Sequence, residues 1–262
     1  MSNPSMKDAN FLLNKVPEVA IVFWIIKIMS TTVGETGADY LAVHVGLGAS
    51  ATGAIMAALL AAMLIVQVRA RQYVPWVYWL TVVLVSVVGT QITDALTDRL
   101  DVSLYTSTIV FAVLLAATFA VWYWCEQTLS IHTIVTTRRE LFYWTAILFT
   151  FALGTAAGDL ATEALSLGFT IGALAFGAAI AVIAALYFLG VDAVLTFWLA
   201  YILTRPLGAS LGDLLSQSRP NGGVGLGVIA TSIAFLSIIA ALVAYLSFSP
   251  NRIAAPKATG EA

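Results

Sequence analysis

Charge is scarce in this chain of 262 residues. Only 10% of its residues are charged and 60% are hydrophobic, whereas soluble proteins carry about 25% charged residues. So few polar side chains cannot cover the surface of a soluble protein of this size, so we expect an integral membrane protein. The net charge of −2 is too small to favour binding to nucleic acid or another polyanion.

Cysteine and histidine are nearly absent. The single Cys125 excludes an intrachain disulfide, and His44 and His132 lie on opposite predicted faces of the membrane. They cannot form the pair that a haem needs, so no cofactor is identified. Without a GxSxG, HExxH or P-loop motif, hydrolytic or ATP-driven chemistry has no support. We therefore expect no enzyme, although an intramembrane enzyme using Glu35 or Asp39 on a lipid or quinone stays open.

Long hydrophobic runs, by contrast, are abundant. A helix of about 20 apolar residues crosses the hydrocarbon core of a membrane. The stretches that qualify are about 19–38, 47–66, 76–97, 104–125, 141–158, 166–189, 193–212 and 225–247. The sequence therefore predicts an all-α membrane protein with eight transmembrane helices.

One spacing of three residue types recurs along the chain. A Trp is followed ten residues later by a Gly, and five residues after that by an Asp. The copies are Trp24/Gly34/Asp39, Trp79/Gly89/Asp94, Trp144/Gly154/Asp159 and Trp198/Gly208/Asp213. This spacing predicts four tandem repeats. Each repeat holds two helices, so all four enter the membrane from the same side as parallel repeats.

The repeats set the predicted domain organisation. They span about 16–70, 71–135, 136–190 and 191–248, which together form the membrane domain 16–248 between the tails 1–15 and 249–262. Most basic residues fall on one predicted face: Lys7, Lys15, Arg69, Arg71, Arg138, Arg139, Arg252 and Lys257. The positive-inside rule makes that face cytoplasmic. Both tails are then cytoplasmic, and the motif aspartates lie toward the other side.

Polar residues follow one face of the first helix in repeat one. Positions three, seven, eleven and fifteen residues after each Trp stack on one helix face. In repeat one they are Lys27, Thr31, Glu35 and Asp39. The later repeats read Val82, Ser86, Thr90, Asp94, then Ile147, Phe151, Thr155, Asp159, then Tyr201, Arg205, Ala209, Asp213. At these shared positions the repeats differ most in their polar residues. Such differences predict a specialised path through the centre of the helix bundle.

Three of these positions, Lys27, Glu35 and Arg205, carry a charge inside a predicted membrane helix. Such a charge costs about 2.5–3.5 kcal/mol at the bilayer centre on insertion scales, so it normally faces a bundle interior. Lys27 and Glu35 lie roughly 12 Å apart along the helix and cannot pair directly. The charges either line an ion path with Thr31 and Asp39, or form structural ion pairs, or reach an interface by snorkelling.

Glu35 and Asp39, one helical turn apart, form the best candidate metal site. Their oxygen ligands suit Mn²⁺, Mg²⁺ or Ca²⁺, because soft ligands are missing. The other motif aspartates, Asp94, Asp159 and Asp213, form an acidic vestibule in one interpretation. In the other they cap the following turn or are simply solvated.

The motif glycines and tryptophans have plainer interpretations. Small residues in membrane helices let neighbouring helices approach closely. We therefore expect helix packing at Gly34, Gly89, Gly154 and Gly208. The four tryptophans lie near one predicted interface, where an aromatic belt is typical. Pro206, next to Arg205, is expected to loosen or kink its helix.

Two segments carry a resemblance to a known family. The first holds KVPEV at 15–19, Phe23-Trp24, Lys27 and TTVGET at 31–36. The second holds Phe197-Trp198 and LTRPLGASLGD at 203–213. Together they resemble a bacterial membrane-protein family described as four tandem repeats of unknown function, each with two membrane helices and a Trp. The resemblance covers about residues 15–245 and implies an eight-helix protein of the bacterial inner membrane, without implying an activity.

The sequence thus favours a membrane transporter or channel for a small inorganic cation, with a divalent metal such as manganese as its first candidate. Lys27 and Arg205 would be internal counter-charges that a proton or ion displaces between states. The alternative is a structural or accessory membrane protein, whose charges only fix the pairing of helices. The partners expected are the lipid bilayer and the ion.

Overall fold

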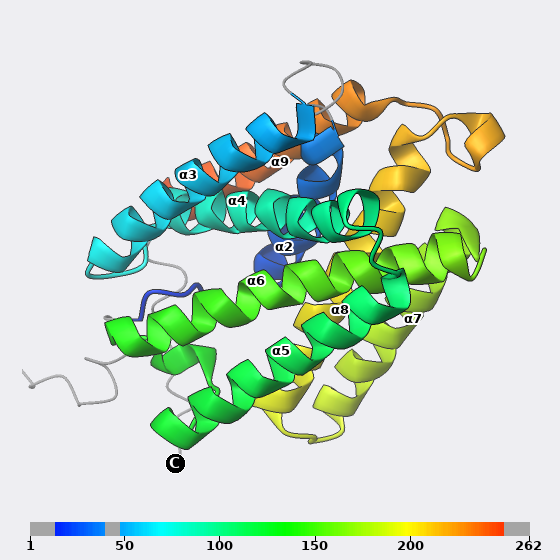
Figure 1. Ribbon diagram of the computed structural model, residues 1–262. Helices are drawn as coiled ribbons and strands as arrows, with labels where there is room; N and C mark the ends of the chain where they lie inside the picture. Colours follow the sequence, from blue (N-terminus) through cyan, green and yellow to red (C-terminus); the bar gives the residue numbers. More distant parts are fainter. Residues whose placement is uncertain (1–13, 40–47, 249–262) are drawn as a thin grey trace, which may run out of the picture.

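Figure 1 shows a computed structural model of the chain, which describes residues 14–39 and 48–248. For Glu35 and Asp39 it describes the backbone only. The long helices are α2 (Ile21–Asp39), α3 (Gly48–Arg69), α4 (Pro75–Asp94), α5 (Leu104–Glu126), α6 (Thr137–Asp159), α7 (Gly168–Phe188), α8 (Ala193–Ser216) and α9 (Val228–Phe248). Short helical turns join them at η2 (Ala95–Arg99), η3 (Ile131–Thr133), η4 (Leu160–Ala164) and η5 (Arg219–Asn221). Residues 14–39 and 48–248 thus confirm the predicted all-α fold with eight long helices.

The helix ends follow local capping chemistry. The hydroxyl of Thr136 accepts a hydrogen bond from Arg139 N at 3.3 Å, so α6 begins four residues before the predicted start. The carboxylate of Asp192 caps α8 in the same way, at 2.8 Å from Leu195 N. Pro206 does not end α8, which continues to Ser216.

Two helices change their winding at the same point of the repeat. The motif residues Asp94 and Asp159 are the last residues of α4 and α6, and a π-helical turn follows each of them. Such turns recur at functional sites in helical proteins. The correspondence between repeats two and three shows that the pseudosymmetry extends beyond sequence spacing into local conformation.

The first helices of the repeats form an inner ring. In it α2 contacts α4, α4 contacts α6, α6 contacts α8, and α8 closes the ring on α2. In the stretches of α4, α6 and α8 that could span a membrane, 56–61% of residues are buried, against 6–17% in the corresponding stretches of α3, α5, α7 and α9. The ring therefore contains the core, and the second helices of the repeats cover it from outside.

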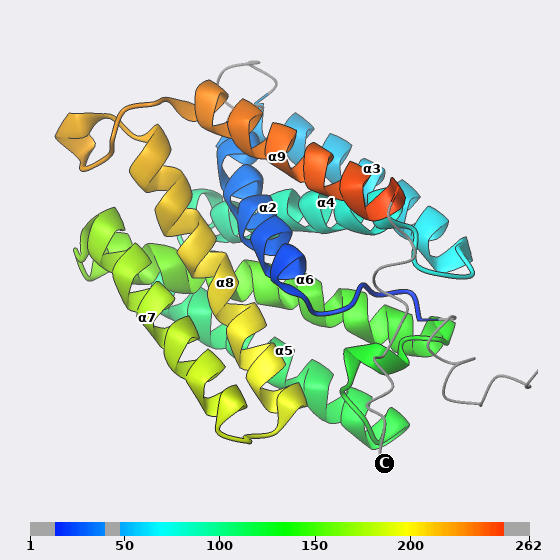
Figure 2. The ribbon, with the colours of Figure 1, turned by 180° about the vertical axis from the view of Figure 1, so that it is seen from behind.

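Each outer helix packs across a repeat boundary. The main partner of α3 is α4, that of α5 is α6, and that of α7 is α8. The last helix, α9, packs on α2 and so joins repeat four to repeat one, as Figure 2 shows. The second helix of every repeat thus rests on the first helix of the next.

The outer surface is strongly apolar. Among the described residues, seven helices are long and apolar enough to cross a membrane, and the apolar part of α2 is the shorter stretch Ile21–Gly34. Large apolar side chains of the outer helices stand exposed, among them Ile109, Leu174 and Ile233. An apolar surface of this extent belongs in hydrocarbon, so the chain is a multi-pass membrane protein.

Candidate functional site

The four motif glycines each lie against the next repeat. A Cβ atom added to Gly34, Gly89, Gly154 or Gly208 would lie 2.6, 2.6, 2.5 and 2.6 Å from the Cβ of Ser86, Phe151, Arg205 and Thr31, respectively. Carbon atoms in contact lie about 3.5–4.0 Å apart, so no side chain fits there. The contacted residue is always the one seven positions after the next Trp, and repeat four contacts repeat one. The inner helices therefore form a closed ring with approximate fourfold symmetry.

An aromatic residue precedes each motif Trp, and these rings pack together at one end of the ring. We call the set the aromatic collar: Phe23, Trp24, Tyr78, Trp79, Tyr143, Trp144, Phe197 and Trp198. Each leading aromatic contacts the Trp of the next repeat, with ring centroids 5.5 Å apart for Phe23–Trp79, 5.5 Å for Tyr78–Trp144, 6.2 Å for Tyr143–Trp198 and 5.6 Å for Phe197–Trp24. The collar defines the Trp end of the ring, and the motif aspartates define the Asp end.

The collar changes the interpretation of the tryptophans. Trp79, Trp144 and Trp198 are no more than 5% exposed, so the expected lipid-facing belt is wrong for these three. These tryptophans instead fill the space between neighbouring inner helices at the Trp end. Nearer the Asp end, the motif glycines let the same helices approach closely. Tyr78 and Tyr143 also share a hydrogen bond between their hydroxyls inside the collar.

Lys27 lies inside the ring, on the Asp side of the collar. Its side chain is fully buried, and its Nζ lies 3.9 Å from the ring centroid of Phe151 and 4.3 Å from that of Tyr201. Within the described part of the chain, Nζ has no hydrogen-bond partner. A desolvated ammonium gains about 2 kcal/mol or more from an aromatic face. Aromatic rings of α6 and α8 therefore stabilise the ammonium of Lys27.

Arg205 crosses the interior of the ring. Its side chain is fully buried, and Nη2 donates hydrogen bonds to Thr90 Oγ1 and, at 2.8 Å, to Thr155 Oγ1. Each threonine hydroxyl also donates to the carbonyl oxygen four residues earlier in its own helix. Thr90 and Thr155 hold the position that Glu35 holds in repeat one. The guanidinium of α8 is thus anchored to α4 and α6 in the layer of Glu35.

Thr31 lies where α2 meets α8. Its hydroxyl donates to Ile28 O at 2.5 Å and is 3.3 Å from Thr204 O of the facing helix. The neighbouring Thr32 donates to Gly208 O at 2.9 Å. These bonds hold two ring helices together, so the polarity of Thr31 serves helix pairing in this conformation.

The structure describes three of the acidic candidates. Asp94, Asp159 and Asp213 are half-buried and share one layer of the repeat register at the Asp end. The side chains of Glu35 and Asp39 lie outside the described part, so the structure does not locate the expected metal pair. Among the side chains that are described, no three of the His, Cys, Asp and Glu type come close enough together to hold a metal ion.

A buried ion pair at the Trp end was not foreseen from the sequence. Lys15 Nζ lies 2.7 Å from Glu140 Oε2 and also donates to Val68 O at 2.9 Å. Gln67 Nε2 donates to the other carboxylate oxygen of Glu140 at 3.1 Å. Lys15 was expected in the cytoplasmic tail 1–15, but it is buried, as is Asn14 before it. The polar sequence of this end predicted exposure to solvent. It could not indicate the ion pair, because the partner Glu140 is 125 residues away in the chain.

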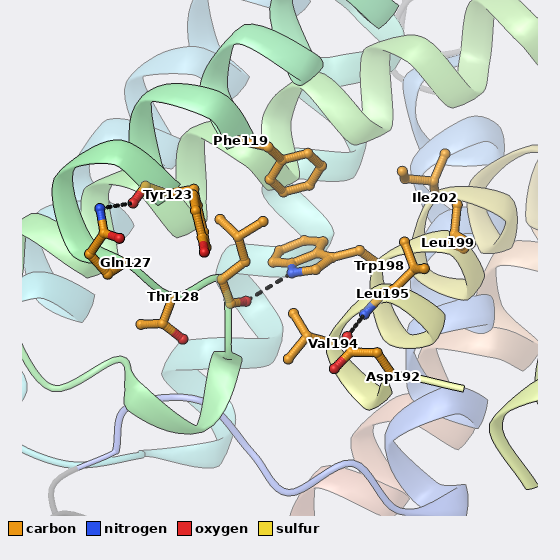
Figure 3. A pocket seen from close by; sticks show the side chains of 11 residues that line it. Phe119, Tyr123, Gln127, Thr128, Asp192, Val194, Leu195, Trp198, Leu199 and Ile202 are labelled. Atoms are coloured by element: carbon orange, nitrogen blue, oxygen red, sulfur yellow. Dashed lines mark hydrogen bonds between the residues drawn. The ribbon is translucent and has the colours of Figure 1, made fainter. Parts of the chain in front are cut away.

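A side pocket of about 510 Å³ opens between α5 and α8 near the Trp end (Figure 3). Its floor is apolar, and Trp198 Nε1 donates there to Leu129 O at 2.9 Å. A lipid or quinone enzyme would need an apolar groove near Glu35. The Glu35 layer lies about 16 Å farther along the ring, by the rise of a helix over eleven residues. This pocket does not supply such a groove.

The structure therefore brings together only part of the predicted path. Lys27, Thr31 and Arg205 lie inside one ring. Thr90 and Thr155, which were not among the predicted site residues, accept hydrogen bonds from the guanidinium. Both threonines belong to the repeated polar face, so the signal for them was present in the spacing.

Comparison with known proteins supports the repeat architecture. A family model described as Repeat of Unknown Function (DUF347) matches the chain four times, at residues 22–73, 77–128, 142–190 and 196–251. Each match covers one inner helix and the outer helix that follows it. No curated protein and no solved structure matches the chain.

Proposed function

We propose that this chain, which belongs to the DUF347 repeat family, is a membrane transport protein for a small inorganic cation, with manganese(II) as the first candidate. The single observation that carries the proposal is the buried guanidinium of Arg205, held across the ring interior by Thr90 and Thr155. Charged side chains inside membrane helices normally mark ion or proton paths.

The proposed path follows the pseudofourfold axis. Cations gather at the Asp end, where the half-buried Asp94, Asp159 and Asp213 share a layer. They then reach the layer of Glu35, Thr90 and Thr155, where hydroxyl and carboxylate oxygens suit a hard divalent ion. We propose Glu35 and Asp39 as the ligands that bind it.

Arg205 acts in this mechanism as an exchangeable counter-charge. Two of its hydrogen bonds go to the hydroxyls of Thr90 and Thr155 in that layer. A cation that arrives in the same layer repels the guanidinium and can displace it from the threonines. Lys27 would be the second counter-charge, with Phe151 and Tyr201 accommodating it.

The proposal includes an orientation. The Trp end carries Lys15, Arg138 and Arg139, and the positive-inside rule places it in the cytoplasm. Both chain ends would then be cytoplasmic in an inner membrane, and the Asp end would face outward.

A second candidate is a structural membrane protein that moves no ion. The packing of Lys27 favours it, because two aromatic faces already stabilise the ammonium. The surrounding layers are also closed, since Ser86, Phe151 and Arg205 are no more than 1% exposed. In this alternative the charges fix which helix packs on which.

The metal content of cells that produce the protein separates the two candidates. The test variant is Glu35→Gln, and the matched control is Glu126→Gln, which removes a carboxylate at the Trp end of α5 that pairs with Arg138 and Arg139. Transport predicts that wild-type protein shifts cellular manganese, that Glu126→Gln does the same, and that Glu35→Gln does not. Unchanged manganese with the wild-type protein, across magnesium and calcium as well, would favour the structural candidate.

A further inference from the structure

The segment before α2 crosses one end of the ring. Lys15 is fixed at the start of α6 through Glu140 and at the end of α3 through Val68 O. Six residues later the chain begins α2 at Ile21. Helices α2 and α6 both contact α4 and α8, so they occupy opposite corners of the ring. The segment therefore joins opposite corners of the ring at the Trp end, and Figure 2 shows it running from the start of α2 toward the first turns of α6.

Simple dimensions agree with this path. Neighbouring helices pack about 8–10 Å apart, which gives a diagonal of about 11–14 Å for a ring of four. Six extended residues reach at most about 20 Å, so the segment is long enough to span the diagonal. Residues 14–17 are all buried, and Val16 belongs to the main hydrophobic core. A segment outside any helix that is buried in this way is packed against the bundle.

The fastening of the segment is concentrated at one point. Lys15 makes the 2.7 Å ion pair with Glu140, and its backbone N donates to Ile134 O at 3.1 Å. The pair is buried, with side-chain exposures of 8% and 1%. Breaking a buried pair by removing one partner is strongly destabilising, since the other charge is left uncompensated. At the other end of the segment, Val19 is half-buried and Ala20 is exposed.

We propose that residues 14–20 form a strap that closes the Trp end of the axis, and that the Lys15–Glu140 ion pair is its latch. The strap rests on the proposed transport function, because only a conducting axis needs closing. Release of the latch frees the strap from α6 and uncovers the aromatic collar, while α2 keeps its place in the ring.

Two measurements on the full-length protein test the strap. The first uses Val16→Cys in a Cys125→Ser background, so that the only thiol is the one on the buried side of the strap itself. Its rate of reaction with a small water-soluble thiol reagent in detergent reports how often the strap lifts. The second measures Mn²⁺ uptake into liposomes that contain the same proteins.

The latch is released in two ways, by Glu140→Gln and by Lys15→Met. Glu126→Gln is the matched control, because it breaks the ion pairs to Arg138 and Arg139 and leaves the strap untouched. The double exchange of Lys15→Glu with Glu140→Lys should restore the latch with reversed charges. A single symmetric peak in size-exclusion chromatography shows that each variant has folded.

The strap predicts at least about a tenfold rise in thiol reactivity and faster Mn²⁺ uptake in both latch variants, with both values near wild type in the control and the double exchange. Unchanged reactivity in the latch variants would overturn the proposal whatever the uptake. A rise in reactivity with unchanged, measurable uptake would also overturn it, and would leave the transport function intact. Absence of uptake in every variant, including the released ones, would instead remove the transport function and the strap's role with it.

Discussion

Substitution of Gly89 by Ala should weaken the ring at one contact. The added Cβ would lie 2.6 Å from Phe151 Cβ and 3.3 Å from Ala152 N, and the second of these is a backbone atom that cannot rotate away. Restoring contact distances of about 3.5 Å requires α4 and α6 to separate by roughly 1 Å. Overpacking of this kind typically costs about 1–3 kcal/mol.

Gly177 on the outer helix α7 provides the matched control. An added Cβ there would meet only Leu207, at 3.9 Å, which is an ordinary contact. In a helix interior Ala is preferred over Gly by about 0.8–1.0 kcal/mol, so Gly177→Ala should be neutral or stabilising. Both glycines lie in helix interiors and gain this preference equally, so the two variants should differ by about 1–3 kcal/mol, the cost of overpacking.

The assay is unfolding by sodium dodecyl sulfate in mixed micelles, followed by circular dichroism, for both variants and the wild type. The same test extends to Gly34, Gly154 and Gly208, whose added Cβ atoms would meet facing Cβ atoms at 2.5–2.6 Å. If Gly89→Ala unfolds at the same detergent fraction as Gly177→Ala, the close approach of the inner helices is refuted.

Two further predictions concern polar groups inside the ring. Lys27→Met should leave stability unchanged or raise it, because Met keeps the contacts with Phe151 and Tyr201 and removes a buried charge. Unfolding in mixed micelles measures this. A loss of stability would show that Nζ has a partner. Tyr78→Phe should cost about 1–3 kcal/mol, because it leaves the hydroxyl of Tyr143 buried without its partner, whereas the double change of Tyr78 and Tyr143 to Phe should be nearly neutral. Equal losses in the single and double variants would contradict the shared hydrogen bond.

The long hydrophobic runs were enough to predict the helices, and the repeat spacing was enough to predict their grouping in pairs, because the Trp, Gly and Asp residues mark the same positions in each inner helix. It was not enough to predict which helices pack together. The outer helices are apolar around their whole circumference, so no stripe indicates which neighbour α3 or α9 will meet. Only the structure shows that each rests on the following repeat.

The burial of the motif tryptophans and of Lys15 was also not predicted from the sequence. All four motif tryptophans were expected at the membrane interface, yet three of them are buried in a collar together with the aromatic residue that precedes each Trp. That preceding residue recurs in all four repeats, as Phe23, Tyr78, Tyr143 and Phe197, and its recurrence was a usable signal. For Lys15 no such signal exists, because its partner Glu140 is 125 positions away.

The central claim is that cations cross the membrane along the ring axis. Uptake of Mn²⁺ into liposomes that contain the purified protein tests it most directly, with Glu35→Gln and Glu126→Gln measured beside the wild type. We expect saturable uptake by the wild type and by Glu126→Gln, and a rate at least about tenfold lower in Glu35→Gln, which corresponds to ~1.4 kcal/mol. Uptake by wild-type liposomes no faster than by protein-free liposomes would contradict the account.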